Sequence, residues 1–225
     1  MAHKYYWKDS LTADSSKPGG AIGKIVCVGR NYAAHAAELN NPVPEKPLLF
    51  MKPASAVVAM ERPLDLSEQE GQVHYETEIA LLIGKRLRAA SASSAWEAVS
   101  GVGLALDLTL RDLQSELKKQ GHPWERAKAF DGACPLSRFV PLAAIADREH
   151  IEFSLTIDGE VRQKGDSRKM ITTIPELLAE ISRTFTLEPG DIVLTGTPEG
   201  VGQLKAGQSL DLQLADQLTV STRIV

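Results

Sequence analysis

Apolar runs and alternating apolar positions divide this chain into many short segments with the periodicity of strands. The predicted strands lie at 24–29, 48–52, 191–194, 209–214 and 217–225. Segments 153–157 and 160–162 flank Asp158-Gly159, a dipeptide typical of a two-residue hairpin turn. Because strands outnumber helices, the pattern predicts an α+β or mostly-β fold built around a large mixed sheet.

Helical spacing predicts three helices among these strands, at 31–39, 111–120 and 175–185. Asn31 is a plausible N-cap for the first helix. Gly121 ends the second, since glycine favours the left-handed conformation that often follows a helix. The third has the clearest amphipathic pattern, with a proline suited to its first turn.

Two acids occupy one predicted strand at 74–84, and they carry the strongest chemical signal in the chain. Side chains alternate along a strand, so Glu76 and Glu78 share a face with Ala80 and Leu82. Their backbone positions are roughly 6.6 Å apart. Carboxylates that converge to about 4 Å repel by about 4 kcal/mol at an effective dielectric of 20, so a shared pocket needs a cation or a proton.

A third acid, Asp107, is the only charged residue in the apolar segment 101–109, which predicts a second buried strand. Three oxygen ligands favour Mg²⁺, with Mn²⁺ or Ca²⁺ as alternatives, and disfavour zinc. The competing interpretation places Glu76 and Glu78 on an edge strand facing water and pairs Asp107 with Arg111.

Composition places the chain among ordinary globular proteins and excludes several classes. A length of 225 residues fits one large domain, predicted at 21–225, with a polar appendage at 1–20. The net charge of −4 argues against a nucleic-acid surface, and no segment has the length and apolar character of a membrane span. Two widely separated cysteines in apolar contexts predict reduced thiols and a cytoplasmic location.

Six motifs occur together and in one order along the chain. They are VCVGRNYAAHAAE at 26–38, LLFMKP at 48–53, HYETEIALLIG at 74–84, GLALDLTLRDLQ at 103–114, PWERAKAFDGACPL at 123–136 and LTGTPEGVG at 194–202. This combination resembles the fumarylacetoacetate hydrolase superfamily, in its short single-domain branch. The resemblance implies a rolled mixed β-sheet, a homodimer, and an Mg²⁺ or Mn²⁺ ion held by Glu76, Glu78 and Asp107.

The resemblance also gives His35 and Glu38 a catalytic role. The two residues are three positions apart on one predicted helix, so the carboxylate can orient the imidazole. In relatives of this type the matching pair activates water and sits on a segment that closes over substrate. The alternative is an incidental, exposed pair of side chains.

Four further polar residues match positions of the family's active site. Lys128 matches a lysine that stabilises an oxyanion or enolate, although most lysines simply lie at the surface. Arg111 and Gln114 could share a helix face and point at substrate. Thr197 would bind the substrate carboxylate, within a glycine-rich stretch that lacks the ending of a nucleotide-binding loop.

The expected function is cleavage of a C–C bond in a small 2-oxo acid through an enolate. Acylpyruvate hydrolysis and oxaloacetate decarboxylation both fit, because both generate the same kind of intermediate. Tautomerisation or isomerisation of a 2-oxo acid, and dehydration or hydration of a sugar acid, are alternatives on the same scaffold. A catalytically silent metal-dependent binding protein is the alternative from another class.

Overall fold

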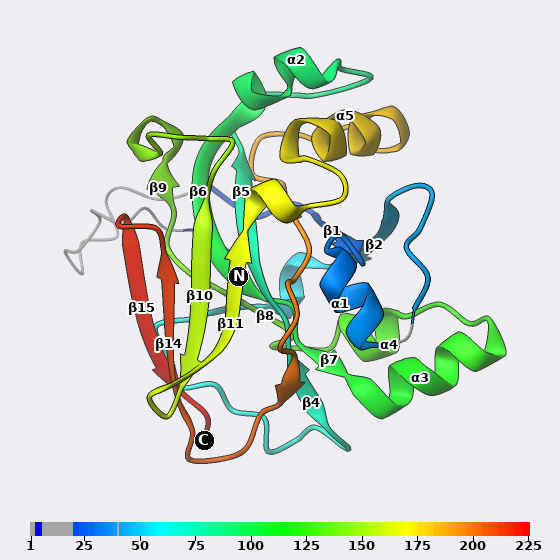
Figure 1. Cartoon of the computed structure of the whole chain (residues 1–225), viewed down its shortest axis with the longest axis vertical. Coiled ribbons are helices and arrows are strands. Elements are labelled where there is room, and N and C mark those ends of the chain that lie inside the picture. The colour runs from blue at the N-terminus through cyan, green and yellow to red at the C-terminus, as the bar shows by residue number, and fades with distance from the viewer. Residues whose placement is uncertain (1–2, 6–19, 40) are drawn as a thin grey trace.

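The computed structural model describes residues 3–5, 20–39 and 41–225, and three β-sheets dominate it (Figure 1). The largest sheet runs in the order β2 (Leu48–Lys52), β1 (Ile25–Gly29), β12 (Ile192–Leu194), β5 (Thr77–Ile83), β6 (Val99–Leu106), β8 (Cys134–Leu136), β3 (Val57–Ala59), with β9 (Val140–Pro141) also paired to β6. The pairs β1–β12 and β3–β8 are parallel and the other pairs are antiparallel. The predicted mixed sheet in a mostly-β fold is therefore confirmed.

Two smaller sheets complete the strand framework. One is antiparallel, in the order β11 (Glu160–Asp166), β10 (Glu152–Ile157), β14 (Ser209–Leu214), β15 (Leu218–Arg223). The other joins β13 (Gly202–Gln203), β4 (Val73–Tyr75) and β7 (Thr109–Leu110). The predicted hairpin is confirmed, because Asp158 and Gly159 both have positive φ, 51° and 82°, as a type I′ turn requires.

Helices are short and lie around the sheets. They are α1 (Ala33–Glu38), α2 (Ala92–Ala95), α3 (Arg111–Gln120), α4 (Glu125–Lys128) and α5 (Ile174–Thr184), with 3₁₀ turns at Ala54–Ala56, Trp96–Ala98, Leu142–Ala144 and Ser167–Lys169. A capping box between Thr173 and Glu176 begins α5, and Gly121 at φ 68° ends α3 as predicted. No helix among the described residues is long and apolar enough to cross a membrane.

The large sheet is buried on both faces, which explains why β5 reads as a continuous apolar run. Ile79, Leu81 and Ile83 belong to the larger core cluster, while the alternating Ala80 and Leu82 belong to a second cluster on the opposite face. The four-stranded sheet packs on the larger cluster through alternating residues of β10 and β14 (Figure 1). An acid on β5 consequently has no solvated side to turn to.

Three expectations from the sequence differ from the structure or fall outside it. The predicted strand at 74–84 is interrupted at Glu76, which joins β4 to β5. Asn31 is not an N-cap, because α1 begins after Tyr32 and the Asn31 side chain bonds to backbone groups elsewhere. Most of the predicted appendage, residues 1–2 and 6–19, lies outside the described residues.

Candidate active site

The strand pairing of β5 with β6 brings the three predicted metal ligands together. Thr77 pairs with Leu106, so Glu76 and Asp107 lie beside each other just beyond the ends of both strands. The Asp107 amide donates a hydrogen bond to the Glu76 carbonyl at 2.8 Å, and Glu78 lies one strand position further in. One carboxylate oxygen from each acid lies within 4.8 Å of the others. The interpretation of Glu76 and Glu78 as water-facing residues is wrong, since they are 6% and 1% exposed.

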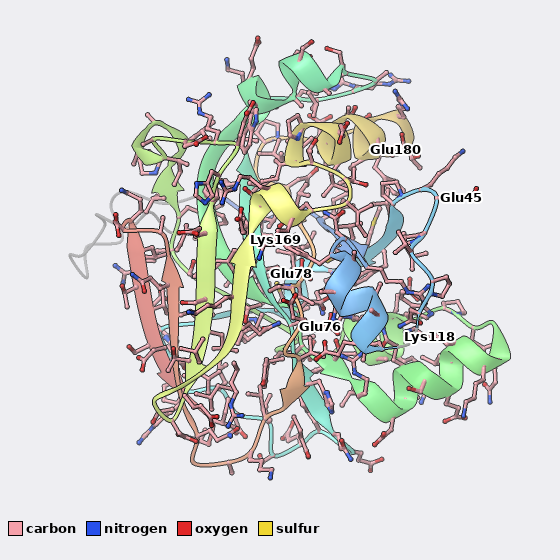
Figure 2. The ribbon with its side chains drawn as sticks, in the orientation of Figure 1. Glu45, Glu76, Glu78, Lys118, Lys169 and Glu180 are labelled. Carbon is pink, nitrogen blue, oxygen red and sulfur yellow. The ribbon has the colours of Figure 1, made fainter. Side chains whose placement is uncertain are left out.

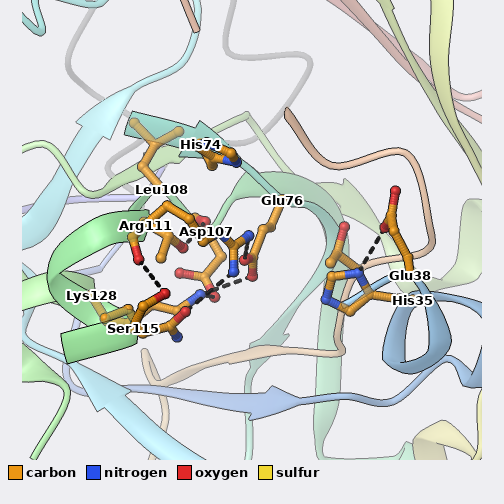
Figure 3. A network of polar contacts seen from close by, with 12 residues as sticks. His35, Glu38, His74, Glu76, Asp107, Leu108, Arg111, Ser115 and Lys128 are labelled. Atoms are coloured by element: carbon orange, nitrogen blue, oxygen red, sulfur yellow. Dashed lines mark hydrogen bonds and ion pairs between the residues drawn. The ribbon is translucent and has the colours of Figure 1, made fainter. Parts of the chain in front are cut away.

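Buried cations bind two of these three carboxylates (Figure 3). Lys128 Nζ lies 2.8 Å from Glu76 Oε2 and 2.6 Å from Asp107 Oδ2, and Arg111 Nη2 lies 2.7 Å from Glu76 Oε1. Arg111 thus pairs with Glu76, and the alternative pairing with Asp107 is not the one formed. Burial alone would raise the pKa of Glu76, but the positive charges of Lys128 and Arg111 outweigh it and lower that pKa.

Glu78 differs from its neighbours because no cation pairs with it among the described residues. Its carboxylate accepts one hydrogen bond, from the Gly196 amide at 2.6 Å. Burial, followed by the negative charges of Asp107 and Glu76, raises the pKa of Glu78 well above its usual range. A buried carboxylate in this situation is stabilised by a proton or by a further cation.

The donor set fits a hard divalent cation at the point where the three carboxylates converge. All three candidate ligands supply oxygen, which Mg²⁺ and Mn²⁺ prefer, and no histidine or cysteine belongs to the group. Glu78 supplies the uncompensated negative charge that such an ion would neutralise. Glu76, Glu78 and Asp107 would therefore hold the ion, with water or substrate completing its coordination.

His35 and Glu38 form the contact expected from their spacing on α1. His35 Nδ1 lies 3.4 Å from Glu38 Oε2, and the Gly200 amide donates to the same carboxylate at 3.1 Å (Figure 3). His35 is 4% exposed whereas Glu38 is exposed, so only one member of the pair lies at the surface. Position 200 requires glycine, because its φ is 92° and a β-carbon there would lie 2.1 Å from the Arg162 carbonyl oxygen.

One pocket collects nearly all of the predicted site residues. Its lining includes His35, Glu76, Glu78, Arg111, Gln114, Lys128 and Thr197, together with apolar walls from β1, β2 and Trp124. Asp107 and Glu38 do not line the pocket themselves. Each contacts a lining residue: Asp107 contacts Lys128, and Glu38 contacts His35. Arg111 Nη1 donates to Gln114 Oε1 at 3.2 Å, so these two residues do share a helix face.

Gln163 and Lys52 are structural parts of the site that the sequence interpretation missed. Gln163 Nε2 donates to Thr197 Oγ1 at 2.9 Å, while its Oε1 accepts from the Thr77 amide. Lys52 is fully buried, with Nζ 2.7 Å from Asp107 Oδ1 and hydrogen bonds to the Leu108 and Lys128 carbonyls. In the sequence, Lys52 stands out as the single charged residue at the end of the apolar segment 48–52. Gln163 had no comparable signal, because its strand is otherwise polar.

Replacing Lys52 by methionine is expected to destabilise the protein by about 3–5 kcal/mol, since Asp107 would lose one of its two buried cations. The free energy of unfolding in urea measures the effect. Lys85→Met, at an exposed lysine, is the control and should change stability by less than about 0.5 kcal/mol. Equal stability of the Lys52 and Lys85 variants would contradict the assigned role of Lys52.

Glu78→Gln is expected to raise the unfolding temperature of the metal-free protein at pH 7.5. Because the folded state holds the Glu78 proton more tightly than the unfolded chain does, wild-type stability falls as the pH rises from the unfolded pKa toward the raised folded pKa. The glutamine side chain of the variant does not titrate, so the stability of the variant should not fall over this pH range. Its advantage should shrink below about pH 4, where the unfolded chain is also protonated.

Added Mg²⁺ should make the unfolding temperature of the wild type higher than that of Glu78→Gln. It should raise the unfolding temperature of the wild type, by binding only the folded state, and leave Glu78→Gln almost unchanged. Glu97→Gln removes an exposed carboxylate and should respond to Mg²⁺ like the wild type. A full Mg²⁺ response in Glu78→Gln would argue against Glu78 as a ligand.

Comparison with known proteins agrees with this geometry. Residues 24–225 match the family model described as Fumarylacetoacetate (FAA) hydrolase C-terminal. The oxaloacetate tautomerase YcgM of Escherichia coli (strain K12) is 47% identical over 205 residues, covering 91% of this chain and 93% of the relative. A mitochondrial oxaloacetate decarboxylase of Dictyostelium discoideum is 44% identical over 186 residues, covering 82% and 85%.

A solved structure extends the likeness to the whole chain. Fumarylpyruvate hydrolase from Pseudomonas aeruginosa, crystallised with Mn²⁺ and pyruvate, has a TM-score of 0.91 and 36% identity, covering all of this chain and 96% of that one. The fold, the six ordered motifs and the match to the family model all indicate the same family. The chain belongs to the fumarylacetoacetate hydrolase family.

Proposed function

We propose that this protein converts small 2-oxo acids through their enolates with the help of Mg²⁺ or Mn²⁺, and that oxaloacetate is a substrate. The observation that carries the proposal is the buried group of three carboxylates in one pocket with Lys128, Arg111 and the His35–Glu38 pair. The names of the tautomerase and decarboxylase relatives support oxaloacetate as the substrate.

A divalent cation in this site would act as a Lewis acid, polarising the 2-oxo group and lowering the energy of the enolate. The residues of the chain supply the remaining functions. Arg111 and Gln114 would orient the substrate, and the Thr197 hydroxyl, held by Gln163, is free to donate to a carboxylate. Lys128 adds positive charge where negative charge develops.

For oxaloacetate tautomerisation the essential step is movement of a proton between C3 and the oxygen on C2. His35 lines the pocket and its Nδ1 faces Glu38, which leaves Nε2 as the atom that would take the proton from C3 and deliver it to the oxygen on C2, or the reverse. Glu38, itself held by the Gly200 amide, stabilises the imidazolium that results. Decarboxylation would instead form the enolate of pyruvate, with the electrons coming from the broken C–CO₂ bond, and protonation at C3 would then give pyruvate.

Acylpyruvate hydrolysis is a second candidate, favoured by the buried His35–Glu38 pair and by the fumarylpyruvate hydrolase relative. His35 would take a proton from water while the water oxygen attacks the distal carbonyl. Cleavage of the C–C bond then yields the enolate of pyruvate and a carboxylic acid, and protonation of the enolate completes the reaction.

The test is a panel of purified enzyme with Mg²⁺ or Mn²⁺ and three assays. These follow ketonisation of enol-oxaloacetate, CO₂ release from oxaloacetate, and loss of the acetylpyruvate chromophore. Sugar-derived 2-keto-3-deoxy acids test the dehydratase alternative. Chelation should remove the activity, and the absence of turnover throughout would support the silent binding protein instead.

His35→Ala should separate the two kinds of chemistry. Hydrolysis of acetylpyruvate needs a base and should fall by about 10²–10⁴-fold, whereas decarboxylation depends mainly on electron withdrawal and should fall much less. The measured quantity is the ratio of the two kcat/KM values, which removes effects common to both reactions. His122→Ala, at an exposed histidine outside the pocket, is the control. Equal losses in both activities would contradict a selective water-activating role.

Residues 30–45 are expected to become more protected when oxalate and Mg²⁺ bind together. This segment contributes Arg30, His35, Leu39 and Asn41 to the pocket lining, so a ligand that mimics the pyruvate enolate should hold it in place. Hydrogen exchange followed by mass spectrometry measures the change, with α5 as an internal reference away from the pocket lining. Unchanged exchange over 30–45 would count against closure of this segment.

A further inference from the structure

Two cations of the pocket lining, Arg30 and Lys118, take no part in holding the carboxylates of the site. Both line the same pocket as Glu76 and Glu78, and Figure 2 labels Lys118 in the same region of the molecule, around α1. Within the described part of the chain, neither side chain forms an ion pair with a carboxylate. They are positive charges in the pocket that no described carboxylate pairs with directly.

The backbone of Arg30 is held in a conformation that arginine rarely adopts. Its φ is 60°, in the left-handed region. The next residue, Asn31, is 2% exposed and keeps the chain there. Its Nδ2 donates to the Thr172 and Thr195 carbonyls at 3.0 and 2.9 Å, and its Oδ1 accepts from the Thr172 amide at 2.8 Å. Such strain persists where the surroundings enforce it and gathers at functional sites.

Lys118 is partly buried against an aromatic side chain of the pocket lining. Its Nζ lies 5.2 Å from the centre of the Trp124 ring, and Trp124 is another residue of the pocket lining. Partial burial, followed by the positive charges of Arg30 and Arg111, lowers the pKa of Lys118 to about 8. Arg111 is occupied by Glu76, so an anion placed beside Arg30 and Lys118 would relieve this repulsion.

The pocket lining thus holds two kinds of cation. Lys128 and Arg111 are paired with the carboxylates that would handle the 2-oxo acid group. Arg30 and Lys118 supply positive charge that these carboxylates do not bind, and Leu39, Leu48 and Phe50 line the same pocket with apolar surface suited to a short carbon chain. A substrate with a neutral tail would leave both cations without a partner, whereas a tail that ends in a carboxylate would pair with them.

We propose that Arg30 and Lys118 form a subsite for the distal carboxylate of a dicarboxylic 2-oxo acid. The enzyme therefore selects substrates that carry a negative charge at the end remote from the 2-oxo group. This inference rests on the proposed function, since it extends the same pocket.

Two stable ligands that differ only in the distal group test the subsite by binding, without turnover. They are 2-oxoglutarate, which ends in a carboxylate, and 2-oxopentanoate, which ends in a methyl group. Calorimetric titration in Mg²⁺ should show tighter binding of 2-oxoglutarate to the wild type. In Arg30→Gln and in Lys118→Gln its affinity should fall about ten- to a hundredfold, while 2-oxopentanoate changes less than about threefold.

Lys119→Gln is the matched control, because it removes the same charge from an exposed neighbour on α3 that does not line the pocket. It should keep the wild-type preference. A preference for 2-oxoglutarate that survives in both variants, or equal loss of both ligands, would overturn the subsite and leave the proposed function standing. Failure of both ligands and of oxalate to bind the wild type with Mg²⁺ would overturn the proposed function and the subsite together.

A kinetic comparison gives an independent readout from one reaction. Fumarylpyruvate and acetylpyruvate are hydrolysed at equivalent bonds but end in a carboxylate and a methyl group. In either variant kcat/KM should fall selectively for fumarylpyruvate, mainly through KM, because the subsite binds ground state and transition state alike. An unchanged ratio of the two values would contradict the assignment.

Discussion

The compensation of buried charge around three carboxylates is the constraint on which this structure depends. Glu76, Glu78 and Asp107 lie where two strands pair inside a sheet that is covered on both faces, so water cannot stabilise them. Lys52, Lys128 and Arg111 neutralise two of the three. The third is left with a backbone amide, so the group is not a closed ion-pair network, and a bound cation would complete its charge compensation.

Several parts of the fold meet at this group of charges, each through a polar residue buried far from its own sequence neighbours. Gln163 on β11 connects the four-stranded sheet to Thr77 and Thr197, while Asn31 connects the start of the pocket wall to the segments before α5 and after β12. Because each residue bonds to backbone groups of other elements, the site is positioned by the docking of the sheets as well as by local structure. Disturbing that docking would move the acids relative to the base.

Local periodicity accounts for what the sequence predicted well, and long-range bonds account for what it did not. Helix α3 with Gly121, the hairpin at Asp158-Gly159 and the positions of strands such as β1 and β2 follow from spacing and turn residues close together in the chain. The interruption of the predicted strand at Glu76 could not be predicted in this way, because it depends on β4 and β5 pairing with different sheets. Asn31 resembled a helix cap, and only the position of residues 172 and 195 reveals its actual partners. Lys52 carried the same signal as Asp107, a lone charge in an apolar run, and the two turn out to bind each other.

The proposed chemistry separates reaction class from substrate choice. Tautomerisation, decarboxylation and acylpyruvate hydrolysis each pass through an enolate of a 2-oxo acid, so the carboxylates, Lys128 and Arg111 would stabilise all three and discriminate little among them. Discrimination has to come from groups that only some reactions or substrates use. In the proposed mechanism the His35–Glu38 pair would matter where a base moves a proton, and the charge of Arg30 and Lys118 would matter where the substrate ends in an anion. Substitutions confined to α1, α3 and the segments beside them would therefore change the preferred reaction or substrate while leaving the three carboxylates in place.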